Sequence, residues 1–179
     1  MKFANLKTRI PDGHYKANIS WRCLPDALRR YKEEAMCPLD IEPDFQRGHV
    51  WTEEQQVAYV EFKLSGGAGS NIIQLNCPGW MSSFDGPFVL VDGLQRITAV
   101  ARFLNNEIKA FWTLYSEFED SLGSIDPDFI FCVNNLKTRA EVLTWYIEMN
   151  TGGTPHTREE IARVCEMLHE ERKLEEGGR

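Results

Sequence analysis

The sequence predicts one domain of mixed architecture, in which short buried strands are combined with amphipathic helices. Two observations predict it. Short β-prone apolar runs bounded by turn residues recur along the chain, at residues 72–76, 88–91 and 129–133. Other segments carry apolar residues three and four positions apart, which is typical of helices that bury one face.

The helix starts are marked by capping boxes, in which a hydroxyl residue is followed three positions later by Gln or Glu. Such boxes begin at Thr52, Thr138 and Thr157. Residues 24–36 also have helical spacing, and so does the segment that ends at Leu104. We therefore expect five helices, the last two of which form a helical C-terminal portion.

The other segments are predicted from turn chemistry and alternation. Residues 39–51 form an irregular loop with a short edge strand and aromatic anchors. Asp85-Gly86 indicates a hairpin that leads into the strand at 88–91. Residues 110–115 alternate loosely and are expected to form a strand, while the acidic residues 116–128 are expected to be exposed.

The domain boundaries follow from the same patterns. Residues 1–20 have weak periodicity and are expected to form an extended arm with room for one short strand. Residues 21–169 form the folded domain. Residues 170–179 are charged and end in glycines, so we expect a flexible tail, either disordered or a fraying helix.

Composition excludes several classes of protein. The 179 residues carry a net charge of −7, which argues against a broad basic face for DNA. This charge is still compatible with a small local pocket that binds phosphate. No apolar run approaches the roughly 20 residues that a membrane span needs, so we expect a cytoplasmic protein. The five cysteines are scattered without a Cys-x-x-Cys pair, so buried thiols are expected rather than disulfides or zinc.

The junction between the strand at 88–91 and the following helix concentrates chemical groups. Asp92, Gly93, Gln95 and Arg96 lie where helix-start N–H groups and a guanidinium converge, a suitable place for a phosphate or a sugar. The alternative is structural: Asp92 caps the helix and Arg96 is a solvated first-turn residue.

Two further segments strengthen the functional interpretation. Gln46-Arg47 belongs to the anchored loop, and the run from Asn150 through Gly152 and Gly153 is rich in glycine. Together with the corner, they would supply guanidinium groups and N–H donors for a triphosphate, while Asp92 would hold a hydrated Mg²⁺ or orient an attacking water. We expect Arg47 and Arg96 to face one cleft. The sequence has no zinc-ligand spacing, nucleophile elbow or phosphate-binding P-loop.

Three motifs in order carry a family resemblance. Residues 43–51 (PDFQRGHVW), 91–99 (VDGLQRITA) and 149–155 (MNTGGTP) resemble the N-terminal domain family of GmrSD-type modification-dependent restriction endonucleases, in the ParB and sulfiredoxin-like superfamily. The family's second motif usually reads Asp-Gly-Gln-Gln-Arg, whereas this chain has Leu94 at the middle position.

The resemblance implies an α+β fold of the ParB type, a small mixed sheet flanked by helices. It implies that Asp92 and Arg96 are the catalytic and phosphate-contacting residues. The wider nucleotide-binding set that we expect comprises Phe45, Gln46, Arg47, Gly93, Gln95, Thr98, Asn150, Gly152 and Gly153. Asp92 is also the expected Mg²⁺ ligand.

The activity implied is hydrolysis of a nucleoside triphosphate in a DNA restriction, anti-restriction or modification setting, with DNA or a nuclease as further partners. The restriction proteins continue into an HNH-type nuclease domain, and no such constellation is seen here. We therefore expect a stand-alone nucleotide-binding half, which suggests a phage or mobile-element gene. The alternatives are a non-catalytic nucleotide-gated module, a DNA nickase and a small-molecule kinase.

Overall fold

The computed structural model describes residues 15–34, 38–80, 82–83, 86–150 and 157–177. Its strands are β1 (Tyr15–Ser20), β2 (Leu39–Asp40), β3 (Ile72–Asn76), β4 (Phe88–Asp92) and β5 (Asp128–Asn134). Its α-helices are α1 (Leu24–Arg29), α2 (Glu53–Leu64), α3 (Leu94–Leu104), α4 (Arg139–Asn150) and α5 (Arg158–Gly177). A π-helical turn, η3 (Arg30–Glu34), extends α1.

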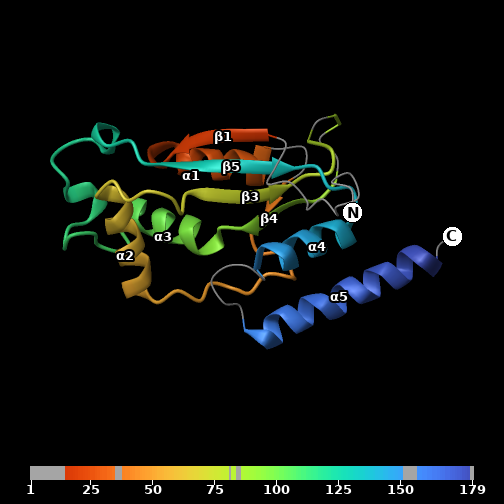
Figure 1. Cartoon of the computed structure of the whole chain (residues 1–179). Coiled ribbons are helices and arrows are strands. Elements are labelled where there is room, and N and C mark those ends of the chain that lie inside the picture. Colours follow the sequence, from red (N-terminus) through yellow and green to blue (C-terminus); the bar gives the residue numbers. More distant parts are fainter. Residues whose placement is uncertain (1–14, 35–37, 81, 84–85, 151–156, 178–179) are drawn as a thin grey trace, which may run out of the picture.

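The five strands form one mixed sheet in the order β1-β5-β3-β4-β2. β1 pairs antiparallel with β5, and β4 pairs antiparallel with β3, whereas the β5–β3 and β4–β2 pairs are parallel. α1, α2 and α3 pack against one face of this sheet, α4 packs against the other, and α5 packs against α4. Figure 1 shows α5 running beyond α4. The predicted α+β class is confirmed.

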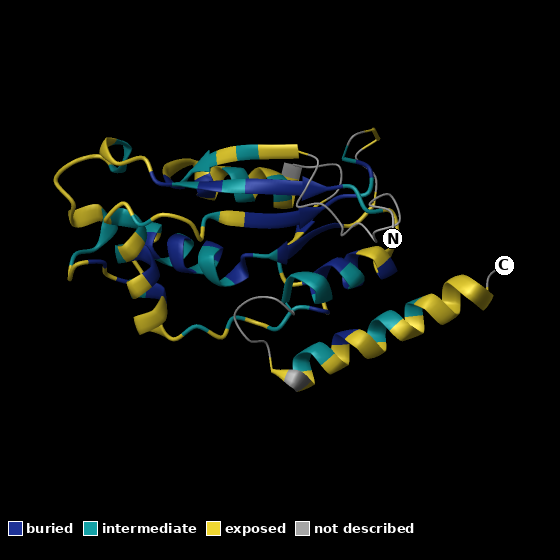
Figure 2. Ribbon diagram, viewed as in Figure 1, coloured by how far each residue is buried: buried dark blue, intermediate teal, exposed yellow. Residues whose placement is uncertain are grey.

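β4 separates two hydrophobic cores. Phe88 and Leu90 belong to the larger one, while Val89 and Val91 belong to a smaller one that lies against α4. Successive side chains of a strand point to opposite faces, so β4 is covered on both sides, as its continuous apolar run predicts. Figure 2 shows β3, β4 and β5 as the most buried strands and α5 as mostly exposed.

The predicted helix starts are confirmed by their hydrogen bonds. The Thr52 amide donates to Oε1 of Gln55 at 2.9 Å, and the Gln55 amide donates to Oγ1 of Thr52 at 3.4 Å. The boxes at Thr138 and Thr157 close in the same way, with Glu141 and Glu160 as partners. None of the described helices combines the length and apolar character needed to cross a membrane.

Several predictions need correction or extension. Residues 110–115 do not form a strand, because only Ala110 and Thr113 pair, across a tight turn. The expected short strand of the arm is β1, and residues 170–177 are the end of helix α5. Of the thiols expected to be buried, Cys77 and Cys132 are, but the described residues also include two exposed ones, Cys23 and Cys165. Cys37 lies outside the described residues.

Candidate functional site

A cavity of about 250 Å³ opens where β4 ends and α3 begins. Its walls come from the loop before α2, the β4–α3 corner and the end of α4. The lining residues are Gln46, Arg47, Trp51, Val91, Asp92, Gly93, Leu94, Gln95, Arg96, Tyr146, Met149 and Asn150. Arg47 and Arg96 thus share one cavity, as expected.

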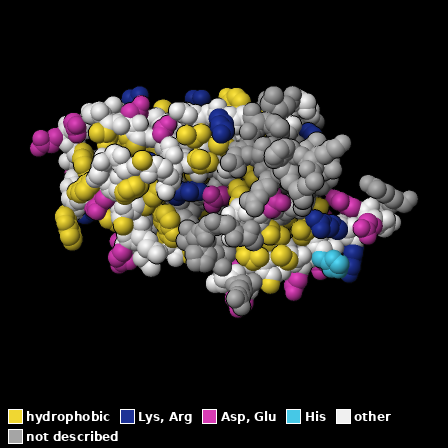
Figure 3. Space-filling model, in the orientation of Figure 1, with side chains coloured by type: hydrophobic (Ala, Val, Ile, Leu, Met, Phe, Trp, Pro, Cys, Tyr) yellow, Lys and Arg dark blue, Asp and Glu magenta, His cyan; other side chains and the backbone are white. Residues whose placement is uncertain are grey.

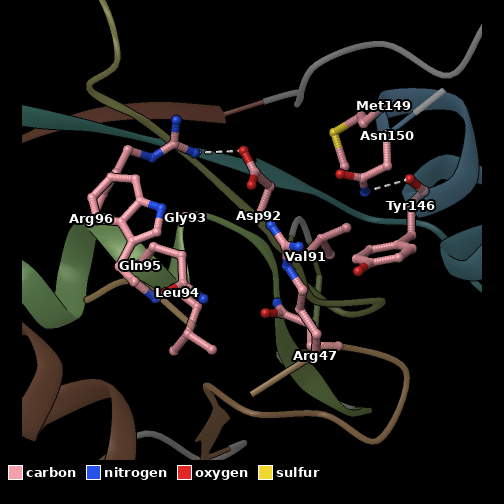
Figure 4. A pocket seen from close by; sticks show the side chains of 12 residues that line it. Arg47, Val91, Asp92, Gly93, Leu94, Gln95, Arg96, Tyr146, Met149 and Asn150 are labelled. Atoms are coloured by element: carbon pink, nitrogen blue, oxygen red, sulfur yellow. Dashed lines mark hydrogen bonds and ion pairs between the residues drawn. The ribbon is translucent and has the colours of Figure 1, made fainter. Parts of the chain in front are cut away.

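Arg96 and Asp92 form an ion pair at the rim of this cavity. Nη2 of Arg96 donates to Oδ2 of Asp92 at 2.5 Å, and the two side chains are 20% and 47% exposed. Nε of Arg96 is buried and has no hydrogen-bond partner among the described residues. In Figure 4 the pair is joined by a dashed line, and Tyr146, Met149 and Asn150 stand on the opposite side of the cavity.

Asp92 does not cap α3, so the structural alternative for this residue is wrong. The N-cap is Gly93, with a φ of 118° and no side-chain capping bond. A Cβ atom on Gly93 would lie 2.5 Å from Cδ1 of Ile73 in β3. Only glycine fits here without backbone strain or overlap with the core.

Arg47 is held by α5. Its Nη1 lies 3.4 Å from Oε2 of Glu160, and both side chains are about one quarter exposed, at 25% and 28%. Nη2 of Arg163, one turn further along α5, donates to the backbone oxygens of Phe45 and Gln46. The loop that carries Arg47 is therefore fixed from the side of α5.

Gln95 fixes the same loop from the side of α3. Its Oε1 accepts hydrogen bonds from the Val50 and Trp51 amides at 3.0 and 3.1 Å, and its Nε2 donates to the Gly48 oxygen at 3.2 Å. Since the amide group is already engaged with backbone atoms, Gln95 positions the loop rather than offering its side chain to a ligand.

Two of the predicted site residues do not line the cavity. Phe45 is 2% exposed and lies behind the wall, with its ring 5.3 Å from that of Tyr146. Thr98 follows Arg96 by two positions on α3, and residues so spaced do not share a helix face. Gly152 and Gly153 lie outside the described residues, so their place in the site stays a prediction.

The cavity also contains residues that the sequence did not single out as site residues. Trp51 and Met149 belong to the first and third motifs but were given no site role, and Tyr146 was expected only on the apolar face of a helix. Tyr146 and Asn150 are four residues apart, so they share one face of α4, and Nδ2 of Asn150 donates to the backbone oxygen of Tyr146 at 2.8 Å. The polar Asn150 at the end of that face was the signal in the sequence that this face of the helix borders a site.

The charges of the lining favour an anion. Two arginines and one carboxylate face the cavity, and the first-turn N–H groups of α3 add partial positive charge. Among the residues that the structure describes, no three His, Cys, Asp or Glu side chains gather as a metal site. Mg²⁺ is often held by one carboxylate together with substrate phosphates and water, so Asp92 fits Mg²⁺ only as part of such a complex.

Tyr146 is a neutral phenol at ordinary pH. Burial raises its pKa to about 12, and Glu160 and Asp92 act in the same direction, while Arg47 and Arg163 oppose them. The folded state therefore keeps its proton at a pH where the unfolded state loses it. The stabilisation is fully present below about pH 10 and is lost as the pH rises towards 12.

We expect the free energy of unfolding to fall less steeply between about pH 10 and 12 in Tyr146→Phe than in the wild type. Urea unfolding at several alkaline pH values measures both slopes. The difference between the two proteins is the relevant quantity, because burial also raises the pKa of Tyr31 and Tyr59. Equal slopes would contradict a raised pKa for Tyr146.

Comparisons of the chain with protein-family models, curated proteins and solved structures find no match.

Proposed function

We propose that this cavity binds the phosphate chain of a nucleoside triphosphate and that the protein hydrolyses it. The observation that carries the proposal is the convergence of Arg47, Arg96 and Asp92 on one cavity at the start of α3. The restriction, anti-restriction or modification setting rests on the three-motif resemblance alone, and so does the role of DNA or a nuclease as a further partner.

Phosphate recognition follows from the donors around the cavity. Guanidinium groups bind phosphate oxygens in pairs, and the start of a helix attracts anions. Arg47 and Arg96 reach the cavity from separate elements, so they contact different parts of a phosphate chain. Gly93 lines the cavity between them, at the corner where the first N–H groups of α3 begin.

Hydrolysis requires a water molecule that attacks the terminal phosphorus atom while the bond to the leaving diphosphate oxygen breaks. Asp92 is the carboxylate of the cavity lining, and it orients that water or would, together with the phosphates, hold a Mg²⁺. A bound Mg²⁺ would neutralise part of the phosphate charge. Arg96 stabilises the charge that develops on the transferred group. The products are a nucleoside diphosphate and inorganic phosphate.

The second candidate is a nucleotide-gated binding module without turnover. The Asp92–Arg96 ion pair favours it, because the guanidinium of Arg96 already neutralises part of the Asp92 charge and so makes the carboxylate a weaker acceptor for an attacking water. Ligand binding without hydrolysis would then change the affinity for a partner. The two candidates share the same cavity and differ in what Asp92 does.

Phosphate release and thermal stabilisation, measured with each nucleoside triphosphate and Mg²⁺, test both candidates. We expect Arg96→Ala to lose both signals, whereas Asp92→Asn loses phosphate release but keeps the stabilisation. Arg172→Ala, which removes an equal charge from an exposed site on α5, is the matched control and retains both. Stabilisation without any phosphate release supports the binding module, and no stabilisation by any nucleotide contradicts both candidates.

Glu160 competes with the ligand for Arg47, and its removal should tighten binding. Glu160→Gln keeps the helix cap, since Gln also closes a capping box, but it removes the charge that faces Arg47. We expect the Kd for a non-hydrolysable triphosphate analogue to fall about 2- to 5-fold, the effect of one partly exposed ion pair. Calorimetry measures the change.

Glu159→Gln is the control for this experiment. Glu159 is exposed on α5 next to Glu160, and its replacement changes the net charge by the same amount. Equal tightening in the two variants would show a general charge effect and would remove the specific competition for Arg47.

A further inference from the structure

The segment between α3 and β5 contains an aromatic turn outside the cavity motifs. Ala110 and Thr113 exchange two backbone hydrogen bonds of 3.0 Å, and Phe111 and Trp112 occupy the two positions between them. Both have positive φ angles, 51° and 63°. Trp112 is 92% exposed and Phe111 is 47% exposed.

The two central residues of this turn are of types that disfavour its backbone conformation. Two-residue turns with both central φ angles positive favour Asn and Gly, because bulky side chains are strained there. Oε1 of Glu61 in α2 accepts a hydrogen bond from the Phe111 amide at 2.6 Å and so holds the turn in place. Burial does not account for Trp112, since almost all of its side chain is in solvent.

An apolar cavity of about 170 Å³ lies beside the turn. Phe111 forms part of its wall, together with Phe103, Phe118 and Ile125. Small-molecule sites usually measure about 300–1,000 Å³, so this smaller cavity fits one large apolar side chain better than a complete ligand.

The loop that contains and follows the turn is acidic. Residues 110–136 contain five carboxylates and no Lys or Arg, although Lys109 precedes the turn and Arg22 pairs with Asp126. Glu119 and Asp120 are both exposed, and Asp120 also lines the cavity. At the left end of Figure 3, where Figure 1 places the loops between α3 and β5, hydrophobic and acidic side chains lie next to one another.

We propose that this aromatic-acidic face, formed by Phe111, Trp112, Phe118, Glu119 and Asp120, docks a segment of a partner protein that is cationic and carries one large apolar anchor. The anchor enters the cavity, and Lys or Arg residues beside it meet Glu119 and Asp120. Trp112 covers the segment and offers its ring face to a cation. Nucleic acid and anionic membranes are disfavoured, because their phosphates would face these carboxylates.

A synthetic amphipathic peptide of Leu and Lys is a suitable probe, with a Leu and Glu peptide of the same length as its counterpart. We expect the Leu–Lys peptide to bind, and Trp112→Ala to weaken that binding about tenfold, as for a central interface Trp. Replacement of Leu174, which is 70% exposed on α5, by Ala is the matched loss of an exposed apolar residue and leaves the affinity unchanged.

Charge is tested by a second matched pair. The double variant Glu119→Lys/Asp120→Lys should weaken binding more than Glu175→Lys/Glu176→Lys, which changes the net charge equally at the exposed end of α5. The proposal would be overturned if the two double variants bind the Leu–Lys peptide equally well, or if Trp112→Ala binds it as well as the wild type does. Either result would show non-specific attraction to an acidic protein. Equal binding of the Leu–Glu peptide would also overturn the proposal.

Trp112→Gly separates a docking role from a folding role. Glycine relieves the positive φ, so the expected result is a higher Tm together with loss of peptide binding. A lower Tm would show that Trp112 serves the fold and would contradict its assignment to docking. Two other outcomes would overturn the proposed partner segment if the peptide does not bind. If the wild type binds anionic phospholipid vesicles and Trp112→Ala does not, the face binds a membrane. If the wild type dimerises with increasing concentration and Trp112→Ala does not, the face binds a second copy of the chain.

Discussion

Gly93→Ala should lower the free energy of unfolding by about 2–5 kcal/mol, since it combines backbone strain with overlap in a packed core. The φ of Gly93 is 118°, and the new Cβ would lie 2.5 Å from Cδ1 of Ile73. Ile73 is fully buried, so its side chain has no open space into which to move. β3 or the start of α3 must shift instead, which also displaces the cavity lining.

Gly66→Ala is the matched control for this loss. Gly66 also has a positive φ, 82°, but nothing lies within 4 Å of its added Cβ. We expect about 1–2 kcal/mol there, the effect of the backbone alone. Urea unfolding measures both variants, and equal losses would show that the contact with Ile73 contributes nothing.

Trp145→Ala should lower the free energy of unfolding by about 3–5 kcal/mol. Trp145 is 1% exposed and belongs to the smaller core, where α4 packs against β4. The next residue, Tyr146, lines the cavity, so a collapse of this core should also weaken nucleotide-dependent stabilisation.

Trp145→Phe separates volume from polarity in the same position. The indole Nε1 is buried without a hydrogen-bond partner among the described residues, so its removal relieves a desolvated donor. We expect a loss below about 2 kcal/mol, since much of the aromatic volume is retained. Chemical unfolding of the two variants provides the measurement, and a loss in Trp145→Phe as large as in Trp145→Ala would show that shape, rather than buried area, dominates.

The local features of the fold could be read from the sequence because they depend on neighbouring residues. The capping boxes at Thr52, Thr138 and Thr157 close within four residues, and each forms as predicted. The apolar run of β4 and the helical spacing in α3 were also sufficient to predict these two elements. They placed Asp92 and Arg96 at the corner where the cavity opens.

The tertiary features were less accessible, because they depend on segments that are distant in sequence. The partner of Arg47 is Glu160, and the wall residue Tyr146 comes from a helix whose pattern indicated only packing. Residues 110–115 alternate like a strand, but none of the described strands pairs with them, and the chain reverses at Phe111 and Trp112. Thr98 was included from its motif, although helix geometry turns it away from Arg96.

The hydrogen bonds of Gln95 have a consequence for sequence variation. This one amide meets only backbone atoms of residues 48, 50 and 51, so it recognises the path of the loop and not its side chains. Substitutions at His49 or Val50 therefore leave the bracing intact, whereas position 95 needs a group that both accepts and donates. In related proteins with this geometry, the side chains at positions 49 and 50 should therefore vary more than the amide on α3.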